Sequence, residues 1–174
     1  LAEYVRIDVK SLGLGPNLHD VHQGKLKDAL EDTVTYCVTH VGVEATTADA
    51  QLLSKLPGMD LGKAKAFVAW RDAGGTLAGK AALGAVEGVG LAAAEQAVGF
   101  LRVPTAADPR DRTQLHPEQF GVVEEMAAQV ETDVPGLFKD GRLRARVDLG
   151  RLSKPETPMP LLKQILWQAT AGLA

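Results

Sequence analysis

Aromatic residues are scarce in this sequence, at 5% of 174 residues. Base stacking on aromatic side chains, the usual device of proteins that bind single-stranded nucleic acids, therefore has few candidates. Phe67, Trp70, Phe100 and Trp167 are expected in the core instead. The one cysteine, Cys37, excludes an internal disulfide, and its place in an apolar helical stripe predicts a small buried side chain.

Long hydrophobic runs are also missing. No apolar stretch approaches the ~20 residues that a membrane helix needs, and no signal-peptide pattern opens the chain. We therefore expect a cytoplasmic protein with no membrane partner. Because the chain starts at Leu1 rather than at a methionine, we also expect a part of a longer protein.

The sequence has no excess of basic residues, and its formal net charge is −3. This argues against a general nucleic-acid-binding protein, which depends on many Lys and Arg contacts to phosphate. Residues 52–103 form the one net-positive stretch, with six basic against four acidic residues. Any anion-binding face must therefore be local, and it is expected there.

That stretch contains two glycine turns about 30 residues apart. Leu56-Pro57-Gly58-Met59-Asp60 and Val86-Glu87-Gly88-Val89-Gly90 each end one apolar helix and lead into another. Glycine permits a tight turn and a close approach, while the first amides of the next helix lack partners and carry the positive end of its dipole. Such a helix-hairpin-helix unit is suited to hold a phosphate group rather than to read bases.

The spacing of apolar residues predicts further helices on both sides of the tandem units. One helix is expected near 23–40, and another follows a cap at Thr46 or Thr47. Segment 141–146 alternates basic and apolar residues, which indicates either a short strand edge or an exposed basic face. The remaining helices are expected at 62–71, 79–86, 91–101, 117–130 and from Thr157-Pro158 onward.

The predicted fold class is mainly α, a tandem helix-hairpin-helix domain flanked by additional helices, with little or no β structure. We expect three regions. Residues 1–22 form an extended tail leaving a preceding domain, and residues 23–103 form a helix plus the tandem domain. Residues 104–174 form a helical linker or wedge region leading to a missing C-terminal domain.

Candidate catalytic and metal-binding groups find little support in the sequence. No Walker loop, zinc pattern or Ser-His-Asp arrangement is recognisable, so we expect no enzyme, cofactor, metal or small-molecule substrate. His116, before Pro117, is expected to satisfy helix amides. The other groups, which we interpret as solvated or capping residues, are His19, Asp20, His22, Asp108, Asp111, Glu124 and Glu125.

An ordered set of motifs resembles the bacterial Tex transcription accessory proteins over nearly the whole chain. In order, the motifs are Leu12-Gly13-Leu14-Gly15, His19-Asp20-Val21, Val41-Gly42-Val43, the two hairpins, Val68-Ala69-Trp70-Arg71-Asp72, Gly99-Phe100-Leu101-Arg102-Val103 and Leu115-His116-Pro117-Glu118. The resemblance implies a multidomain cytoplasmic protein that binds nucleic acid and is linked to transcription. It also implies that this stretch leaves an RNase H-like YqgF domain, passes through the helix-hairpin-helix domain and leads toward an OB-fold RNA-binding domain.

We therefore predict a sequence-independent module that binds the backbone of DNA or RNA, with the transcription machinery as a further partner. The predicted contact residues are Gly58, Met59, Gly62, Gly88, Val89, Gly90 and Ala92 in the hairpins, with Lys55, Lys63, Lys65 and Arg71 as nearby charge.

Two features depart from the usual hairpin pattern. Asp60 stands where a second glycine is usual, and its carboxylate repels a phosphate. The second unit has Leu91-Ala92-Ala93-Ala94 where a lysine is frequent. The alternative function is a structural or protein-interaction scaffold that braces neighbouring domains without contacting nucleic acid.

Overall fold

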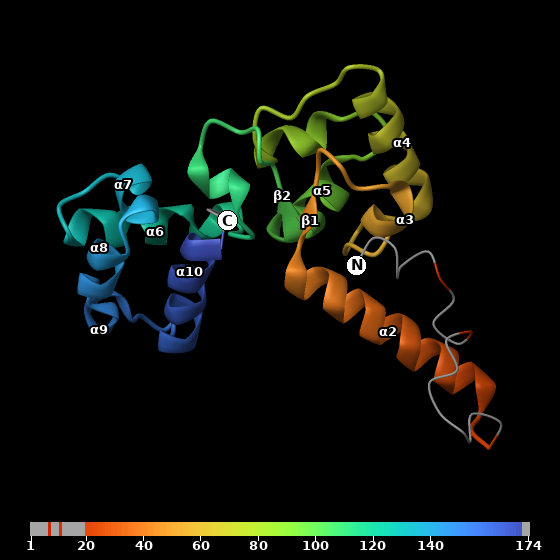
Figure 1. Cartoon of the computed structure of the whole chain (residues 1–174), viewed down its shortest axis with the longest axis horizontal. Coiled ribbons are helices and arrows are strands. Elements are labelled where there is room, and N and C mark those ends of the chain that lie inside the picture. Colours follow the sequence, from red (N-terminus) through yellow and green to blue (C-terminus); the bar gives the residue numbers. More distant parts are fainter. Residues whose placement is uncertain (1–6, 8–10, 12–19, 172–174) are drawn as a thin grey trace.

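The computed structural model describes residues 20–171, together with Ile7 and Ser11. These residues are mainly helical, as predicted, and one long helix runs away from the other elements (Figure 1). Most of the predicted 1–22 tail, including Leu12-Gly13-Leu14-Gly15 and His19, lies outside the described residues. The elements are α2 (Gln23–Val41), β1 (Val43–Glu44), α3 (Ala50–Leu53), α4 (Leu61–Asp72), η2 (Lys80–Ala85), α5 (Leu91–Ala97), η3 (Val98–Phe100), β2 (Leu101–Arg102), η4 (Pro109–Arg112), η5 (Pro117–Gln119), α6 (Phe120–Gln129), α7 (Val134–Lys139), α8 (Gly141–Arg146), α9 (Leu149–Leu152) and α10 (Met159–Ala171).

The buried apolar residues form two separate cores. The first runs from Val38 to Ala106 and includes Phe67, which is 1% exposed at the centre of α4. The second runs from Leu115 to Ala169 and is filled by α6, α7 and α10. The described chain therefore contains two helical units, joined by the loop and short turns between β2 and α6.

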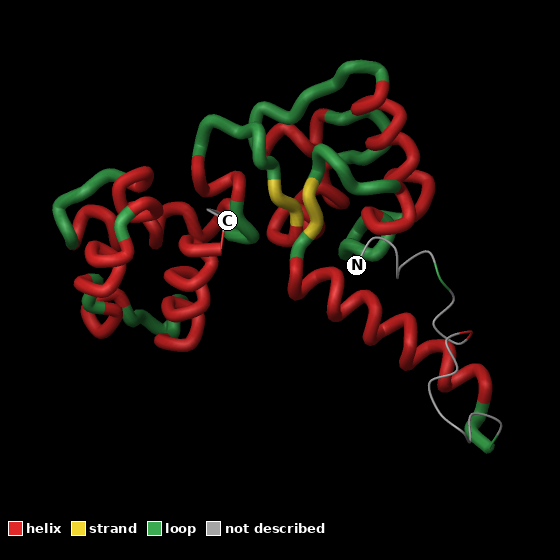
Figure 2. The backbone as a smooth tube through the Cα atoms, viewed as in Figure 1, coloured by secondary structure: helices red, strands yellow, loops and turns green. Residues whose placement is uncertain are grey.

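A two-stranded parallel sheet closes the first unit (Figure 2). Strand β1 pairs with β2 in the register Val43 with Leu101 and Glu44 with Arg102. The amide of Ala45 extends the pairing by donating to the Arg102 carbonyl at 2.9 Å. The sheet thus ties the end of α2 to the end of the second hairpin unit.

Helix α2 is long and barely packed. His22 caps its start by accepting from the Lys25 amide, and Gly42 ends it with φ +78°. Val38 is the one buried residue among its 19. The prediction that Cys37 is buried is wrong, because only the last turns of α2 meet the core and Cys37 faces solvent.

Three further local predictions are corrected by the structure. Asp49, rather than Thr46 or Thr47, caps α3 by accepting from the Leu52 amide at 2.8 Å. Trp167 is 58% exposed rather than a core residue. The helix predicted over 91–101 ends at Ala97, where a 3-10 turn leads into β2.

Segment 141–146 is a helix and not a strand edge. The Asp140 carboxylate accepts from the Arg142 amide at 2.8 Å and so caps the start of α8. Arg144 donates to the carbonyls of Leu137 and Phe138 at the end of α7. The exposed side chains of Arg142 and Arg146 agree with the alternative interpretation, an exposed basic face.

Each hairpin of the first unit packs its first glycine against the helix that follows the other hairpin. A Cβ on Gly58 would lie 3.1 Å from the Cα of Ala93 in α5, and a Cβ on Gly88 would lie 2.7 Å from the Cβ of Ala66 in α4. Both glycines have positive φ, +76° and +84°. Only glycine combines this backbone conformation with such a close contact. The two hairpins are therefore reciprocally locked.

Two basic side chains connect the first unit to the second. Lys80 is 1% exposed, and its ammonium donates a hydrogen bond to the Leu115 carbonyl at 2.5 Å. Arg110 contacts both Asp108 and Glu124 of α6, and its guanidinium lies 4.5 Å from the ring centroid of Phe120. These contacts hold the loop that joins the two units against both of them.

The hairpin glycines give a first prediction. Gly88→Ala combines a positive-φ cost of about 1–2 kcal/mol with overlap against α4, so we expect it to lower the free energy of unfolding by about 2 kcal/mol or more. Gly90→Ala is the matched control, because Gly90 has φ +80° but open space around a Cβ. Urea denaturation should show a clearly larger loss for Gly88→Ala; equal losses would contradict the close packing.

Lys80 gives a second prediction. Burial lowers the pKa of Lys80 to about 7, opposed by the nearby Asp111 charge. The unfolded state therefore binds more protons than the folded state between about pH 7 and the ordinary lysine pKa, so the contribution of Lys80 to the free energy of unfolding rises with pH in that window. Lys80→Met should remove this rise. Urea denaturation at several pH values measures it, and identical pH slopes for both proteins would contradict the assignment.

Candidate anion-binding hairpins

The first hairpin carries its own anion at the start of α4. Asp60 caps the helix, and its Oδ1 accepts from the Lys63 amide at 2.8 Å. Its Oδ2 lies 3.1 Å from the Lys63 ammonium, which also donates to the Gly58 carbonyl at 3.2 Å. A Cβ on Gly62 would lie 3.1 Å from Asp60 Oδ1, so the carboxylate occupies the position over the first turn.

The electrostatics of the first hairpin agree with this geometry. The backbone amide of Lys63, followed by its ammonium, holds the pKa of Asp60 below its ordinary value. Asp60 is therefore charged at neutral pH and neutralises Lys63. The amides and the lysine that were predicted to attract phosphate are already engaged with a carboxylate.

The second hairpin lacks such a group. Gly90 occupies the cap position of α5, with φ +80°, and no side chain caps the helix. A Cβ added to Gly90 would meet nothing within 4 Å, so the space beside the first turn is open. Leu91 and Ala92 are exposed there. The amides at the start of α5 are thus accessible to an external acceptor.

The hydrophobic residue at each hairpin tip serves the core. Met59 is 4% exposed and Val89 is 3% exposed. Their amides donate to the carbonyls of Leu56 and Val86, each at 3.1 Å, and so close the two turns. The structure therefore gives Met59 and Val89, both predicted as contact residues, a role in shaping the turn, because neither the side chain nor the amide is available.

The four predicted cations occupy different environments. Lys65 is exposed on α4, next in sequence to Ala66, which touches Gly88. Lys55 is half-buried. Arg71 donates to the carbonyls of Ala45 and Ala48 at 3.1 and 2.6 Å and so holds a loop. Lys65 is therefore the exposed one of the four predicted cations, and it lies on the helix against which Gly88 packs.

Other candidate groups have structural roles. His116 caps η5, where its Nδ1 accepts from the Glu118 amide and its own amide donates to Gln119, as predicted for this position. No group of three or more His, Cys, Asp or Glu residues within the described part of the chain is placed to hold a metal ion. Of the described helices, none is both long and apolar enough to span a membrane.

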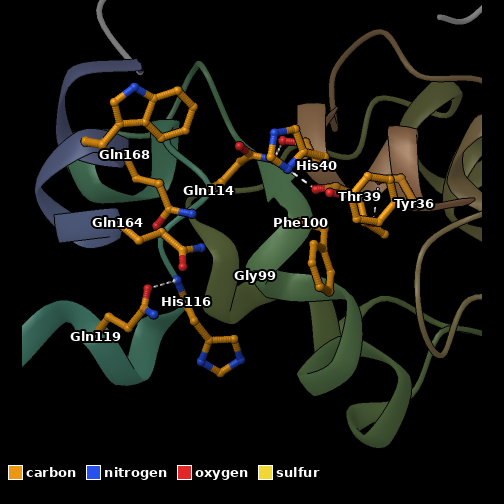
Figure 3. A pocket seen from close by; sticks show the side chains of 11 residues that line it. Tyr36, Thr39, His40, Gly99, Phe100, Gln114, His116, Gln119, Gln164 and Gln168 are labelled. Carbon is orange, nitrogen blue, oxygen red and sulfur yellow. Dashed lines mark hydrogen bonds between the residues drawn. The ribbon is translucent and has the colours of Figure 1, made fainter. Parts of the chain in front are cut away.

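A groove where the two units meet was not predicted (Figure 3). We call it the junction groove; it has a volume of about 520 Å³ and lies between the end of α2, the η3 turn and α10. Its principal lining residues are Tyr36, His40, Gln114, Gln164, Trp167 and Gln168. The sequence signal was faint: two glutamines four residues apart on α10, with a tryptophan that was expected in the core lying between them.

Two family models match the chain in succession. One, described as a helix-hairpin-helix motif, matches residues 38–102. The other, described as an HHH domain, matches residues 108–169, the stretch expected above only as a helical linker or wedge region. The two matches correspond to the two buried cores.

Several known proteins are similar over most of this chain. Protein tex of Bordetella pertussis is 43% identical over 134 residues, which are 77% of this chain and 17% of that protein. Transcriptional accessory protein Tex of Neisseria gonorrhoeae is 43% identical over 129 residues, 74% of this chain and 17% of that protein. The human S1 RNA-binding domain-containing protein 1 is 31% identical over 156 residues, 89% of this chain and 16% of that protein. The chain thus spans about one sixth of the length of these relatives.

Proposed function

The chain belongs to the Tex family, and from that membership we propose that it binds the sugar-phosphate backbone of DNA or RNA without choosing a sequence. Two kinds of comparison support the proposal. Both family models describe helix-hairpin-helix structure. Among the relatives, one is named a transcriptional accessory protein and another is named for an RNA-binding domain. A link to the transcription machinery, and the absence of catalysis in this stretch, are parts of the same proposal.

The observation that carries the proposal is the open start of α5. Backbone amides at a helix start bind phosphate oxygens well because they are unpaired and carry the positive end of the dipole. The second hairpin offers these amides at Gly90, Leu91 and Ala92 with no capping side chain, and Lys65 lies on the neighbouring helix. In this proposal the second hairpin is the principal contact and the first hairpin mainly shapes the domain.

A scaffold that braces neighbouring domains is the second candidate function. Two observations favour it: the internal ion pair between Asp60 and Lys63, and the exposure of nearly all of α2. A scaffold predicts no affinity for nucleic acid even at low salt. The next experiment therefore separates the two functions.

Lys65→Glu tests the proposed contact. With single- and double-stranded DNA and RNA, fluorescence anisotropy should show that affinity falls in this variant and that the slope of log affinity against log salt is reduced by about 1. Lys27→Glu, an equal charge change on exposed α2, is the matched control and should retain most of the affinity. Equal losses in the two variants would contradict a localised site, and no binding by the unmodified chain would support the scaffold.

Asp60→Asn tests whether the internal carboxylate closes the first hairpin. Asparagine caps helices as well as aspartate does, so the turn is retained while the negative charge is lost and Lys63 is released. We expect affinity for nucleic acid to rise about threefold, as for the removal of one exposed repulsive charge. Asp72→Asn, at the other end of α4, is the control and should leave affinity unchanged. A fall in affinity for Asp60→Asn would show that Asp60 supports binding.

A further inference from the structure

The junction groove is lined mainly by side-chain amides and rings. Its walls carry the amides of Gln114, Gln119, Gln164 and Gln168, together with rings from α2, η3 and α10, and no Lys, Arg, Asp or Glu side chain is among its lining residues. Amides offer both a donor and an acceptor, and ring faces bind flat apolar surfaces. This lining matches a planar, uncharged ring with mixed donors and acceptors on its edge, and it offers no counter-charge to a phosphate or a carboxylate.

One of the amides is buried without a partner. Gln168 is 9% exposed, and its Oε1 has no hydrogen-bond partner among the described residues. A buried carbonyl oxygen left unpaired costs free energy, which a donor from a ligand removes. Figure 3 shows the amide groups of Gln164 and Gln168 directed from α10 into the same space. The two amides can therefore form hydrogen bonds with adjacent positions on the edge of one ring.

The other glutamines hold the groove in shape. Gln114 donates to the carbonyls of Thr39 and His40, each at 3.2 Å, and so ties the joining loop to the end of α2. Gln119 accepts from the His116 amide at 3.1 Å. Because these two amides are engaged, Gln164 and Gln168 are the pair directed toward a ligand.

The two walls of the groove each present an exposed ring. Tyr36 on α2 is 68% exposed and stacks on His40 with ring centroids 5.8 Å apart. Trp167 on α10 is 58% exposed. Exposed aromatic side chains are scarce in this chain, and two of them lie at this one groove. Aromatic side chains are the usual platforms on which unstacked bases rest.

Positive charge lies directly beside the groove rather than inside it. Trp167 also lines a second hollow of about 310 Å³, which it shares with Arg144 and Lys163. Because Trp167 lines both spaces, the group that follows a ring seated against Trp167 could enter this basic hollow. That order, a neutral ring site and then a basic site, corresponds to a base and its adjacent phosphate.

We propose that the junction groove binds one unstacked base of a single-stranded nucleic acid, with Gln164 and Gln168 bonded to its edge and Tyr36 or Trp167 against its face. The inference rests on the proposed function, because it assigns a strand type and a base contact to the same nucleic-acid binding. It adds a second site to the hairpins. The hairpins lie between β1 and β2 in sequence, whereas the rings and amides that would contact the base come before β1 and after β2. A free nucleoside should occupy it without any contact to the hairpins.

The first test uses single-stranded DNA of about ten nucleotides and the same strand with abasic sites throughout, with the full chain. Tyr36→Ala, in an exposed side chain, should weaken binding of the normal strand about tenfold and leave the abasic strand unchanged. Gln168→Met, which keeps the side-chain length, should do the same. Val41→Ala, exposed on the same helix outside the groove, should change neither. Equal binding of the two strands by the unmodified chain, with no effect of Tyr36→Ala, would overturn the base site while leaving the hairpin proposal intact.

A second measurement separates failure of this inference from failure of the proposed function. Adenosine, cytidine, guanosine and uridine, titrated singly, should shift the NMR signals of the Gln168 side-chain amide and the Trp167 indole. Shifts there would support the base site even if no strand bound through the hairpins. If none of the four nucleosides shifts either signal at millimolar concentration, the inference is overturned, whatever the strands do.

Discussion

The reciprocal contact of the two hairpin glycines is the constraint on which the first unit depends. Gly58 lies against α5 and Gly88 lies against α4, so each hairpin packs directly on the helix that follows the other hairpin. Because both positions also require positive φ, the turn and the packing demand the same residue. The buried Met59 and Val89 at the two hairpin tips belong to the same core as these contacts.

Within this near-symmetry the helix-capping position is Asp60 in the first hairpin and Gly90 in the second, and this difference gives the two helix starts different surroundings. Asp60 gives the first hairpin an internal acceptor, which satisfies the start of α4 and engages Lys63. Gly90 gives the second hairpin no acceptor, so the start of α5 is left to solvent or a ligand. A capping carboxylate and an external phosphate compete for the same amides. The first hairpin therefore gains a local cap, and in our proposal the second hairpin leaves the same position open to a phosphate.

Much of the first unit was predictable because its information is local. Apolar spacing located α2 and α4, and glycines located the turns within a residue or two. Cys37 was misplaced because periodicity shows that a stripe is apolar but not whether anything covers it. Segment 141–146 was ambiguous because six residues satisfy either period, and the deciding contact, Arg144 on the end of α7, is tertiary. The role of Arg71 in holding the 45–48 loop and the existence of the junction groove depend on contacts between distant segments, which no single stretch of sequence contains.

A chain with net charge −3 gains little from general attraction to nucleic acid, and the two proposed sites do not depend on it. The open hairpin offers amide dipoles rather than ammonium groups, and the junction groove offers amides and rings with no formal charge. Neither displaces many counterions from a phosphate backbone, so affinity from these sites depends weakly on salt. The basic side chains that these proposals use, such as exposed Lys65 on α4 and Lys163 on α10, are few, so they supply a local attraction rather than a general one. A short contact of the proposed kind would select for geometry, and it would be strengthened if other binding segments held the same strand nearby.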